Sequence, residues 1–212
     1  MQSLNRLKSE RPRRKFDFYE TPKGLCKASL RRFVLDETNL DRYAPFMSVL
    51  DPGCGSGVWE SALYEMYNVS VLDQLSLDGI DMQEKESNLC YTGWFVGDFL
   101  DFNISDKYDL VMGNPPYSLA EEFVRHSMSL IDDGGYVFFL LRLAFLESKK
   151  RHFGLFTEFQ PKRVYVLSRR PSFFSSGNDG KKTTDALAYA MFLWQKGWSG
   201  KTELDWLYWS YE

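Results

Sequence analysis

The chain is 212 residues long, which suffices for one well-buried domain but not for a catalytic domain with a second domain of ordinary size, so we expect one domain. Hydrophobic residues make up 44% and charged residues 26%, proportions that exclude long disordered tracts. The formal net charge of -3 excludes a general polyanion binder, so any contact with nucleic acid must come from local basic patches.

One basic patch lies at the N-terminal end. Between residues 6 and 15 a single acid, Glu10, stands among the basic side chains. These are Arg6, Lys8, Arg11, Arg13, Arg14 and Lys15. We expect residues 1–15 to form a basic arm and residues 16–212 to form the globular domain. A solvated tail is the alternative interpretation, because charge runs are often only that.

Cysteine and histidine do not indicate a metal site. Cys26, Cys54 and Cys90 are widely spaced, and joining them to His126 and His152 produces no zinc-ligand spacing. We therefore expect no metal, and the odd number of cysteines favours a reducing cytoplasm over a disulfide framework. The polar N-terminus predicts no secretory leader, and the apolar runs are too short to span a membrane.

The first predicted element in chain order is an amphipathic helix after Pro22, since proline suits a first helical turn. Its apolar face carries Cys26, Leu30, Phe33 and Val34. The apolar run at 47–50 then predicts a strand, residues 51–57 a glycine loop, and Val58 the start of a second helix.

The remaining pattern alternates strands with helices. Further strands are predicted at 77–82, 94–96, 108–112, 137–146, 163–168 and 186–194. Ser118 and Glu121 have the spacing of a capping box and predict a helix start, 149–159 looks helical, and 175–185 reads as a polar loop. The alternation predicts an α/β fold with a mostly parallel sheet covered on both faces.

Polar residues stand at four successive strand ends. Asp51, Asp81, Asp98 and Asn114 each follow a predicted strand. In open α/β sheets, ligands bind outside the carboxyl ends of the strands, at the point where the strand order reverses. The sequence therefore predicts that these residues converge on one cleft.

The loop Asp51-Pro-Gly-Cys-Gly-Ser-Gly57 brings backbone close to a ligand, because glycine removes the side chain and tolerates positive φ. The spacing of Gly53, Gly55 and Gly57 differs from the dinucleotide fingerprint, and the loop lacks the lysine of a phosphate-binding loop. A tight turn without a ligand is the alternative interpretation.

Two carboxylates complete a predicted nucleoside pocket. Asp81 stands where a carboxylate accepts both ribose hydroxyls, and Asp98 where one accepts from an adenine amino group, with Phe99 beside it as an apolar wall. Aspartates at strand ends are individually ordinary. Together with the glycine loop they indicate a nucleoside without phosphates.

Asn114-Pro115-Pro116-Tyr117 is the most specific signal in the chain. An exocyclic amine or an amide nitrogen is a poor nucleophile, since its lone pair is delocalised. The side-chain carbonyl of Asn114 and the backbone carbonyl of Pro115 each accept one N–H in this hypothesis, which orients the lone pair toward an electrophilic methyl group. Pro116 helps to stiffen the turn, and Tyr117 stacks on the planar acceptor.

These motifs, in this order, resemble those of the Rossmann-like methyltransferases that act on amino nitrogens. Phe18-Tyr-Glu-Thr-Pro22 further resembles the cofactor-side motif of bacterial and phage DNA adenine methylases. The resemblance implies S-adenosyl-L-methionine as cofactor, adenine in DNA as acceptor, and a seven-stranded sheet with a final antiparallel hairpin. The compact form is similar to enzymes of phages and mobile elements, including those of restriction-modification systems.

The resemblance also implies roles for individual residues. Tyr19, Thr21 and Pro22 line the methionine end of the cofactor, with Asp51, Gly53 and Gly55 near its amino-acid part. The cofactor set further includes Asp81, Asp98, Phe99 and Asn114, and the catalytic set is Asn114, Pro115, Pro116 and Tyr117. An aromatic that closes on the extruded base falls at Phe173 or Phe174, and core packing is the alternative for this pair.

Sequence-specific members of the family carry a target-recognition region, for which we expect no counterpart after the last strand. Arg13, Arg14, Lys181 and Lys182 are the candidate contacts to DNA, together with Tyr117. Phosphate contacts position a substrate without reading its sequence, so we expect short or relaxed specificity. A duplex target requires base flipping, which favours single-stranded or loosened DNA.

Three alternatives remain open. In the first, the methyl acceptor is a ribosomal RNA base or a protein glutamine, because Asn-Pro-Pro-Tyr also occurs in those methylases. In the second, the chain is a non-catalytic nucleic-acid-binding protein that retains the fold. The third, an enzyme that transfers hydride, is weaker, since nothing cradles a pyrophosphate. Carbon-5 cytosine methylation is disfavoured because no Pro-Cys pair supplies its nucleophile.

Overall fold

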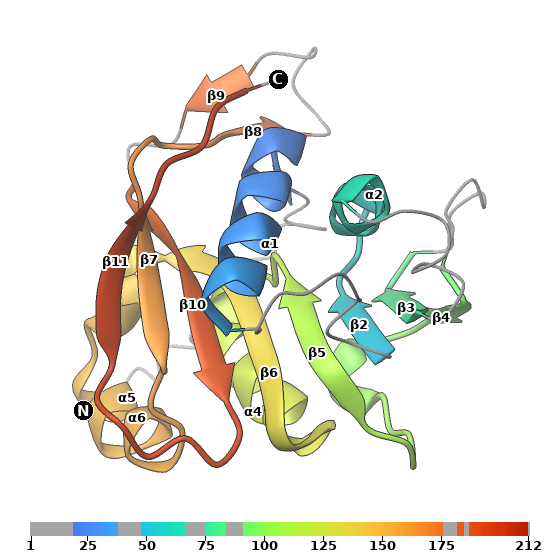
Figure 1. Ribbon diagram of the computed structural model, residues 1–212. Coiled ribbons are helices and arrows are strands. Elements are labelled where there is room, and N and C mark those ends of the chain that lie inside the picture. The colour runs from blue at the N-terminus through green and yellow to red at the C-terminus, as the bar shows by residue number, and fades with distance from the viewer. Residues whose placement is uncertain are drawn as a thin grey trace, which may run out of the picture.

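The computed structural model describes residues 19–37, 48–66, 75–83, 91–175, 182–184 and 187–211 (Figure 1). Its strands are β1 (Tyr19–Glu20), β2 (Ser48–Pro52), β3 (Ser76–Asp81), β4 (Gly93–Val96), β5 (Tyr108–Gly113), β6 (Ile131–Arg142), β7 (Arg163–Leu167), β8 (Ser172–Ser175), β9 (Lys182–Thr184), β10 (Tyr189–Gln195) and β11 (Glu203–Leu207). Its helices are α1 (Lys23–Glu37), α2 (Val58–Met66), α4 (Ala120–Ser129), α5 (Lys149–Phe153) and α6 (Leu155–Glu158), with short 3-10 turns η1 (Phe99–Asp101), η2 (Tyr117–Leu119) and η3 (Leu143–Leu146).

The main sheet has the order β11-β7-β10-β6-β5-β2-β3-β4. All of its pairings are parallel except those of β10, which runs antiparallel to both β6 and β7. The predicted α/β architecture is therefore confirmed. The sheet has 8 strands where we expected seven, because β11 adds to its edge in parallel with β7.

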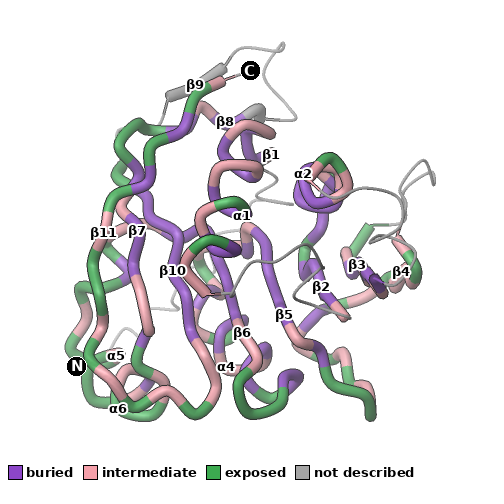
Figure 2. Tube along the Cα trace, in the orientation of Figure 1, coloured by how far each residue is buried: buried purple, intermediate pink, exposed green. Residues whose placement is uncertain are grey.

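Successive side chains of the central strands are buried on opposite faces of the sheet. The face under α1 and α2 buries Val49, Leu110, Met112, Phe138 and Leu140. The face toward α4 buries Leu50, Val111, Val137, Phe139 and Leu141. Figure 2 shows these strands buried along much of their length. Burial on both faces explains why they read as continuous apolar runs in the sequence.

A second, smaller sheet lies beyond the carboxyl ends of the main strands (Figure 1). It has the order β1-β8-β9, and Glu20 of β1 pairs with Phe174 of β8. The segment that we expected to be only a polar loop thus contains β9. This sheet brings the start of the described chain to the edge where the glycine loop lies.

Two helix predictions were wrong in detail. Ser118 lies inside η2, so α4 begins at Ala120 without a side-chain cap, because the Leu119 amide closes a turn onto the Pro116 carbonyl (2.9 Å). The helix expected over 149–159 is divided by Gly154 into α5 and α6.

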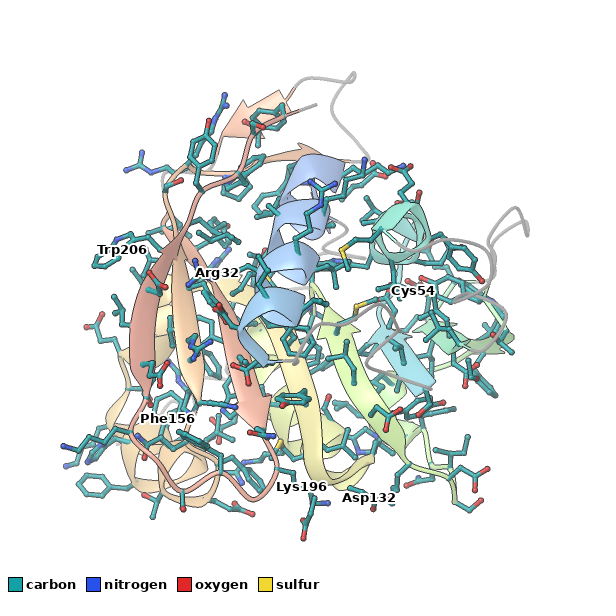
Figure 3. The ribbon with its side chains drawn as sticks, in the orientation of Figure 1. Arg32, Cys54, Asp132, Phe156, Lys196 and Trp206 are labelled. Carbon is teal, nitrogen blue, oxygen red and sulfur yellow. The ribbon has the colours of Figure 1, made fainter. Side chains whose placement is uncertain are left out.

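Ion pairs join α1 to the far edge of the sheet. Arg163 of β7 lies 3.0 Å from both Asp36 and Glu37. Arg32 contacts Asp205 of β11, and Figure 3 shows Arg32 between α1 and that strand. Within the described residues no helix is long and apolar enough to cross a membrane. That same part of the chain contains no group of three His, Cys, Asp or Glu side chains placed as metal ligands.

Candidate active site

Four neighbouring parallel strands bring the predicted polar residues to one edge of the sheet. Asn114 follows β5, Asp51 and Asp81 lie in the last residues of β2 and β3, and Asp98 follows β4. The strand order reverses between β2 and β5, since β3 and β4 lie on one side and β6 on the other. This is the place in an α/β sheet where ligands bind.

The glycine loop between β2 and α2 has the backbone that its composition predicts. Gly53, Gly55 and Gly57 have φ values of 71°, 56° and 75°, which side chains other than glycine rarely adopt. The amides of Gly53 and Cys54 both donate to the carbonyl of Ile80 in β3, at 2.7 and 3.2 Å. No atom lies within 4 Å of where a Gly53 Cβ would stand, so backbone is open to a ligand there.

Asp51 is a buried charge beneath this loop. Its side chain is 0% exposed, and the Tyr91 hydroxyl donates to its Oδ2 at 2.8 Å. The Tyr91 ring lies against Gly79 of β3, where a Cβ would come within 3.1 Å of the ring. Burial, and then the Asp51 carboxylate, raise the pKa of Tyr91 and of the Cys26 thiol. Asp51 is thus held from β3 and β4 by way of Tyr91, and its contact with a cofactor stays a prediction.

Gly113 ends β5 against the same carboxylate. A Cβ at Gly113 would lie 2.8 Å from Asp51 Oδ1, and Asp51 has little freedom to withdraw because Tyr91 holds its other oxygen. We expect Gly113→Ala to lower the free energy of unfolding by about 1–3 kcal/mol, the scale of overpacking in a filled interior. Urea unfolding measures this.

The matched control is Gly97→Ala, because no atom lies within 4 Å of a Cβ at Gly97. It should change stability by no more than about 0.5 kcal/mol, or increase it slightly through the unfolded state. Equal effects of the two substitutions would contradict the close approach to Asp51.

Asp81 is tied to the glycine loop. Its Oδ2 accepts from the backbone amide of Gly55 at 3.0 Å, and its Oδ1 from that of Gln83 at 2.9 Å. The side chain is half-buried, so part of it remains accessible to a ligand. One carboxylate therefore connects the end of β3 to the loop after β2.

Asp98 and Phe99 have separate surroundings. Asp98 is exposed and caps η1, accepting from the Leu100 amide at 3.0 Å. Phe99 is 3% exposed and packs against Phe123 and His126, with ring centroids 4.7 and 4.8 Å away. The structure uses Phe99 in the core, and its role as a wall for a cofactor stays a prediction.

Asn114 is held by the N-terminal motif. Its Nδ2 donates to Thr21 Oγ1 at 3.1 Å, and Thr21 is buried. The preceding residue, Glu20, accepts at 2.7 Å from the hydroxyl of Ser56 in the glycine loop. Adjacent residues of one segment thus reach the two motifs that flank the switch point. The contact with Thr21 fixes the orientation of the Asn114 amide, whose carbonyl oxygen is buried.

Tyr117 lies in a row of aromatic and basic groups. Its ring centroid is 5.5 Å from that of Tyr189, and the Arg142 guanidinium lies 4.9 Å above its ring. Tyr189 in turn packs edge-on against Phe173 at 5.2 Å. Phe173 is 2% exposed and packs in the core, and its role as a base contact stays a prediction.

The remaining candidate residues are placed only in part. Pro115 and Pro22 are buried, and the Pro22 carbonyl accepts from the amides of Leu25 and Cys26 at the start of α1. Tyr19, Phe174 and Lys182 lie in strands β1, β8 and β9, but their side chains lie outside the described part of the structure. Arg13, Arg14 and Lys181 also lie outside the described residues.

Sequence reasoning missed Glu20, Tyr91, Arg142 and Tyr189 as site residues. Two of them left a signal, because Glu20 lies inside the N-terminal motif and Arg142 is the charge that interrupts the apolar run at 137–146. Tyr91 and Tyr189 are aromatic residues in apolar surroundings, and the pattern offers no way to assign them a polar partner. Their contacts depend on strand pairing that joins distant parts of the chain.

No family model matches the chain. It is 28% identical over 115 residues to the type II methyltransferase M.CvrRI of a Paramecium bursaria Chlorella virus, a match that covers 52% of this chain and 27% of that protein. It is 26% identical over 98 residues to malonyl-acyl-carrier-protein O-methyltransferase 1 of Ilyobacter polytropus, covering 43% of this chain and 37% of that protein. The matches span well under half the length of these curated relatives.

Solved structures resemble most of the chain. A protein of Listeria monocytogenes assigned as a class I S-adenosylmethionine-dependent methyltransferase has a TM-score of 0.61 and 14% identity, over 88% of this chain and 65% of that one. A Pyrococcus horikoshii protein assigned as an RNA methyltransferase has a TM-score of 0.62 and 16% identity, over 85% of this chain and 87% of that one. The plantazolicin methyltransferase BpumL, solved in complex with SAH, has a TM-score of 0.53 and 14% identity, over 82% of this chain and 84% of that one. The chain therefore has the Rossmann-like fold of the class I S-adenosylmethionine-dependent methyltransferases.

Proposed function

We propose that this protein is an S-adenosylmethionine-dependent methyltransferase that methylates the exocyclic N6 amino group of adenine in DNA. One observation carries the proposal: Asn114 of the Asn-Pro-Pro-Tyr motif stands at the switch point with its amide nitrogen engaged by Thr21. That contact fixes the orientation of the amide, and we assign its carbonyl to accept an N–H from the acceptor amine.

The residues around the glycine loop fit a nucleoside cofactor without phosphates. The open backbone at Gly53 accommodates the amino-acid part, Asp81 is accessible for the ribose hydroxyls, and exposed Asp98 for the adenine amino group. Both curated relatives are named methyltransferases, and BpumL was solved with SAH, which supports the same cofactor here. When bound, S-adenosylmethionine supplies an electrophilic methyl group on its sulfonium.

The protein's part in the reaction is to orient the amine. The carbonyls of Asn114 and Pro115 accept the two N–H groups, so that the nitrogen lone pair is directed toward the methyl group, and Tyr117 stacks on the base. Transfer is direct, without a covalent enzyme intermediate. Consistent with this, Cys54, the cysteine in the glycine loop, is buried.

DNA is the proposed acceptor, and duplex DNA must present its target base flipped out of the stack. The N-terminal motif resembles that of DNA adenine methylases, and its Glu20 and Thr21 contact the glycine loop and Asn114. The chlorella virus relative is a type II methyltransferase, which supports this choice. We propose short or relaxed sequence specificity, with contacts mainly to phosphates.

The test is to incubate the protein with labelled S-adenosylmethionine and, separately, duplex DNA, single-stranded DNA, ribosomal RNA and a release factor. Mass spectrometry of the digested products identifies the methylated group. N6-methyladenine from DNA is the expected product. Label only in RNA or in a glutamine side chain would move the acceptor, and cofactor binding without transfer to any substrate would favour the non-catalytic alternative.

A further inference from the structure

A surface groove includes Arg142, whose guanidinium lies over the Tyr117 ring. Its volume is about 500 Å³, within the range of small-molecule sites. Its lining includes Arg142, Leu146, Glu147, Val166, Leu187 and Leu204. These residues come from the end of β6, from η3, from β7, from the residues before β10 and from β11, so the groove runs from the candidate active site toward the edge of the sheet.

Arg142 is the cation at the inner end of the groove. Its Nε is buried and has no hydrogen-bond acceptor among the described residues. Its guanidinium lies over the Tyr117 ring, and within that part of the chain it forms no ion pair. A buried donor without an acceptor is costly, and such groups in native proteins usually have a role or a missing partner. An anion bound in the groove would supply the acceptor.

The outer wall of the groove is apolar and continues onto β11. Leu204 and Trp206 lie on one face of this strand and are 55% and 63% exposed, whereas Asp205 and Leu207 face α1. Trp206 pairs with Val166 of β7, which lines the groove, and Figure 3 shows Trp206 at the outer edge of the sheet. Exposed apolar surface that is joined to a cleft indicates a binding surface.

We propose that this groove binds the nucleotide next to the target adenine in an extended single strand. The phosphate contacts Arg142, the base lies on the aliphatic wall formed with Leu187 and Leu204, and Trp206 offers a stacking surface for the next base. A cation beside apolar and aromatic side chains is the combination that binds single strands without sequence preference. The inference rests on the proposed function, because Arg142 of the groove lies over the ring of Tyr117, the residue proposed to stack on the target base.

Fluorescence anisotropy with labelled single-stranded DNA containing one central adenine tests this assignment. Oligonucleotides shortened one nucleotide at a time from either end locate the side on which affinity is lost. Leu204→Glu should weaken binding of the longer oligonucleotides about tenfold, the scale of one lost base contact, and leave the shortest unchanged. Since Leu204 is exposed, this variant should fold, and its cofactor affinity by calorimetry should match the wild type.

Salt dependence separates charge from packing. Arg142→Met should reduce the slope of log affinity against log salt by about 0.7, the contribution of one phosphate contact on a single strand, while Arg142→Lys retains it. Glu147→Gln removes a carboxylate from the groove and should tighten binding. Lys201→Met removes an exposed cation that precedes β11 and is not among the residues that line the groove. It should change neither the affinity nor the salt slope.

The outcomes distinguish this inference from the proposed function. DNA methylation with wild-type affinity and salt slope in Leu204→Glu and Arg142→Met would overturn the groove assignment and leave the function standing. A dimer in light scattering that Trp206→Glu converts to a monomer would assign the β11 face to a second copy and also overturn it. If DNA is neither bound nor methylated, the proposed function fails, and this inference fails with it.

Discussion

Replacing Asn114 by alanine should lower the methyl-transfer rate at saturating cofactor by about 100-fold or more, the scale for losing one positioned electrostatic acceptor. The effect should fall on turnover, because the proposed mechanism assigns the amide carbonyl to the acceptor amine, and the glycine loop and Asp81 to the cofactor. Single-turnover rates with labelled S-adenosylmethionine measure methyl transfer. Calorimetric titration measures the cofactor affinity, which should stay nearly unchanged. Near-normal turnover in Asn114→Ala would refute the mechanism.

Thr21 provides a second test of the same geometry. Thr21→Val removes the hydroxyl that accepts from Asn114 Nδ2 and should lower turnover about tenfold, with Thr21→Ser restoring most of it. The control is Asn103→Ala, since Asn103 is an exposed amide that donates to the nearby Asp101 carbonyl. A loss of stability without a change in turnover would make Thr21 merely structural.

Asp81→Ala should have the converse effect. It removes the carboxylate that accepts from the Gly55 amide, along with the acceptor proposed for the ribose hydroxyls. Hydrogen bonds to a charged group contribute about 1.5–3 kcal/mol, so the dissociation constant for the cofactor should rise about 10- to 100-fold. Calorimetry with S-adenosylmethionine measures the change, and turnover at saturating cofactor should stay close to that of the wild type.

Asp132→Ala is the matched control for charge. Asp132 is an exposed aspartate at the start of β6, and Figure 3 labels it at the end of the sheet that lies away from the glycine loop. Its loss changes net charge equally but should leave cofactor affinity unchanged. If both variants weaken binding alike, the effect is general electrostatics and Asp81 has no specific role.

The sequence predicted the sheet well because its signals are local. Apolar runs buried on both faces marked β2, β5 and β6, and the glycines after β2 marked the turn at which their φ values are positive. The polar residues at strand ends followed from the same pattern, because a parallel sheet brings all its carboxyl ends to one edge. For this reason Asp51, Asp81, Asp98 and Asn114 could be placed at one edge before any contact was known.

The parts that could not be predicted depend on pairing between distant residues. β11 has one exposed face, and its mixed sequence Glu-Leu-Asp-Trp-Leu does not resemble the buried strands. The pairing of β1 with β8 joins segments more than a hundred residues apart, so no local pattern shows it. Phe173 is equally suited by composition to stacking on a base or packing on Tyr189, and only the fold decides between them.

The two-residue strand β1 also has a consequence for how the two substrates influence each other. Glu20 faces the loop proposed for the cofactor, and Thr21 directly after it contacts the residue proposed for the acceptor. Only one peptide unit separates these two contacts, so we expect a backbone shift at one of them to be felt at the other. In the proposed mechanism the two binding equilibria would then be linked, and linkage is reciprocal: the factor by which the cofactor raises the affinity for DNA equals the factor by which DNA raises the affinity for the cofactor.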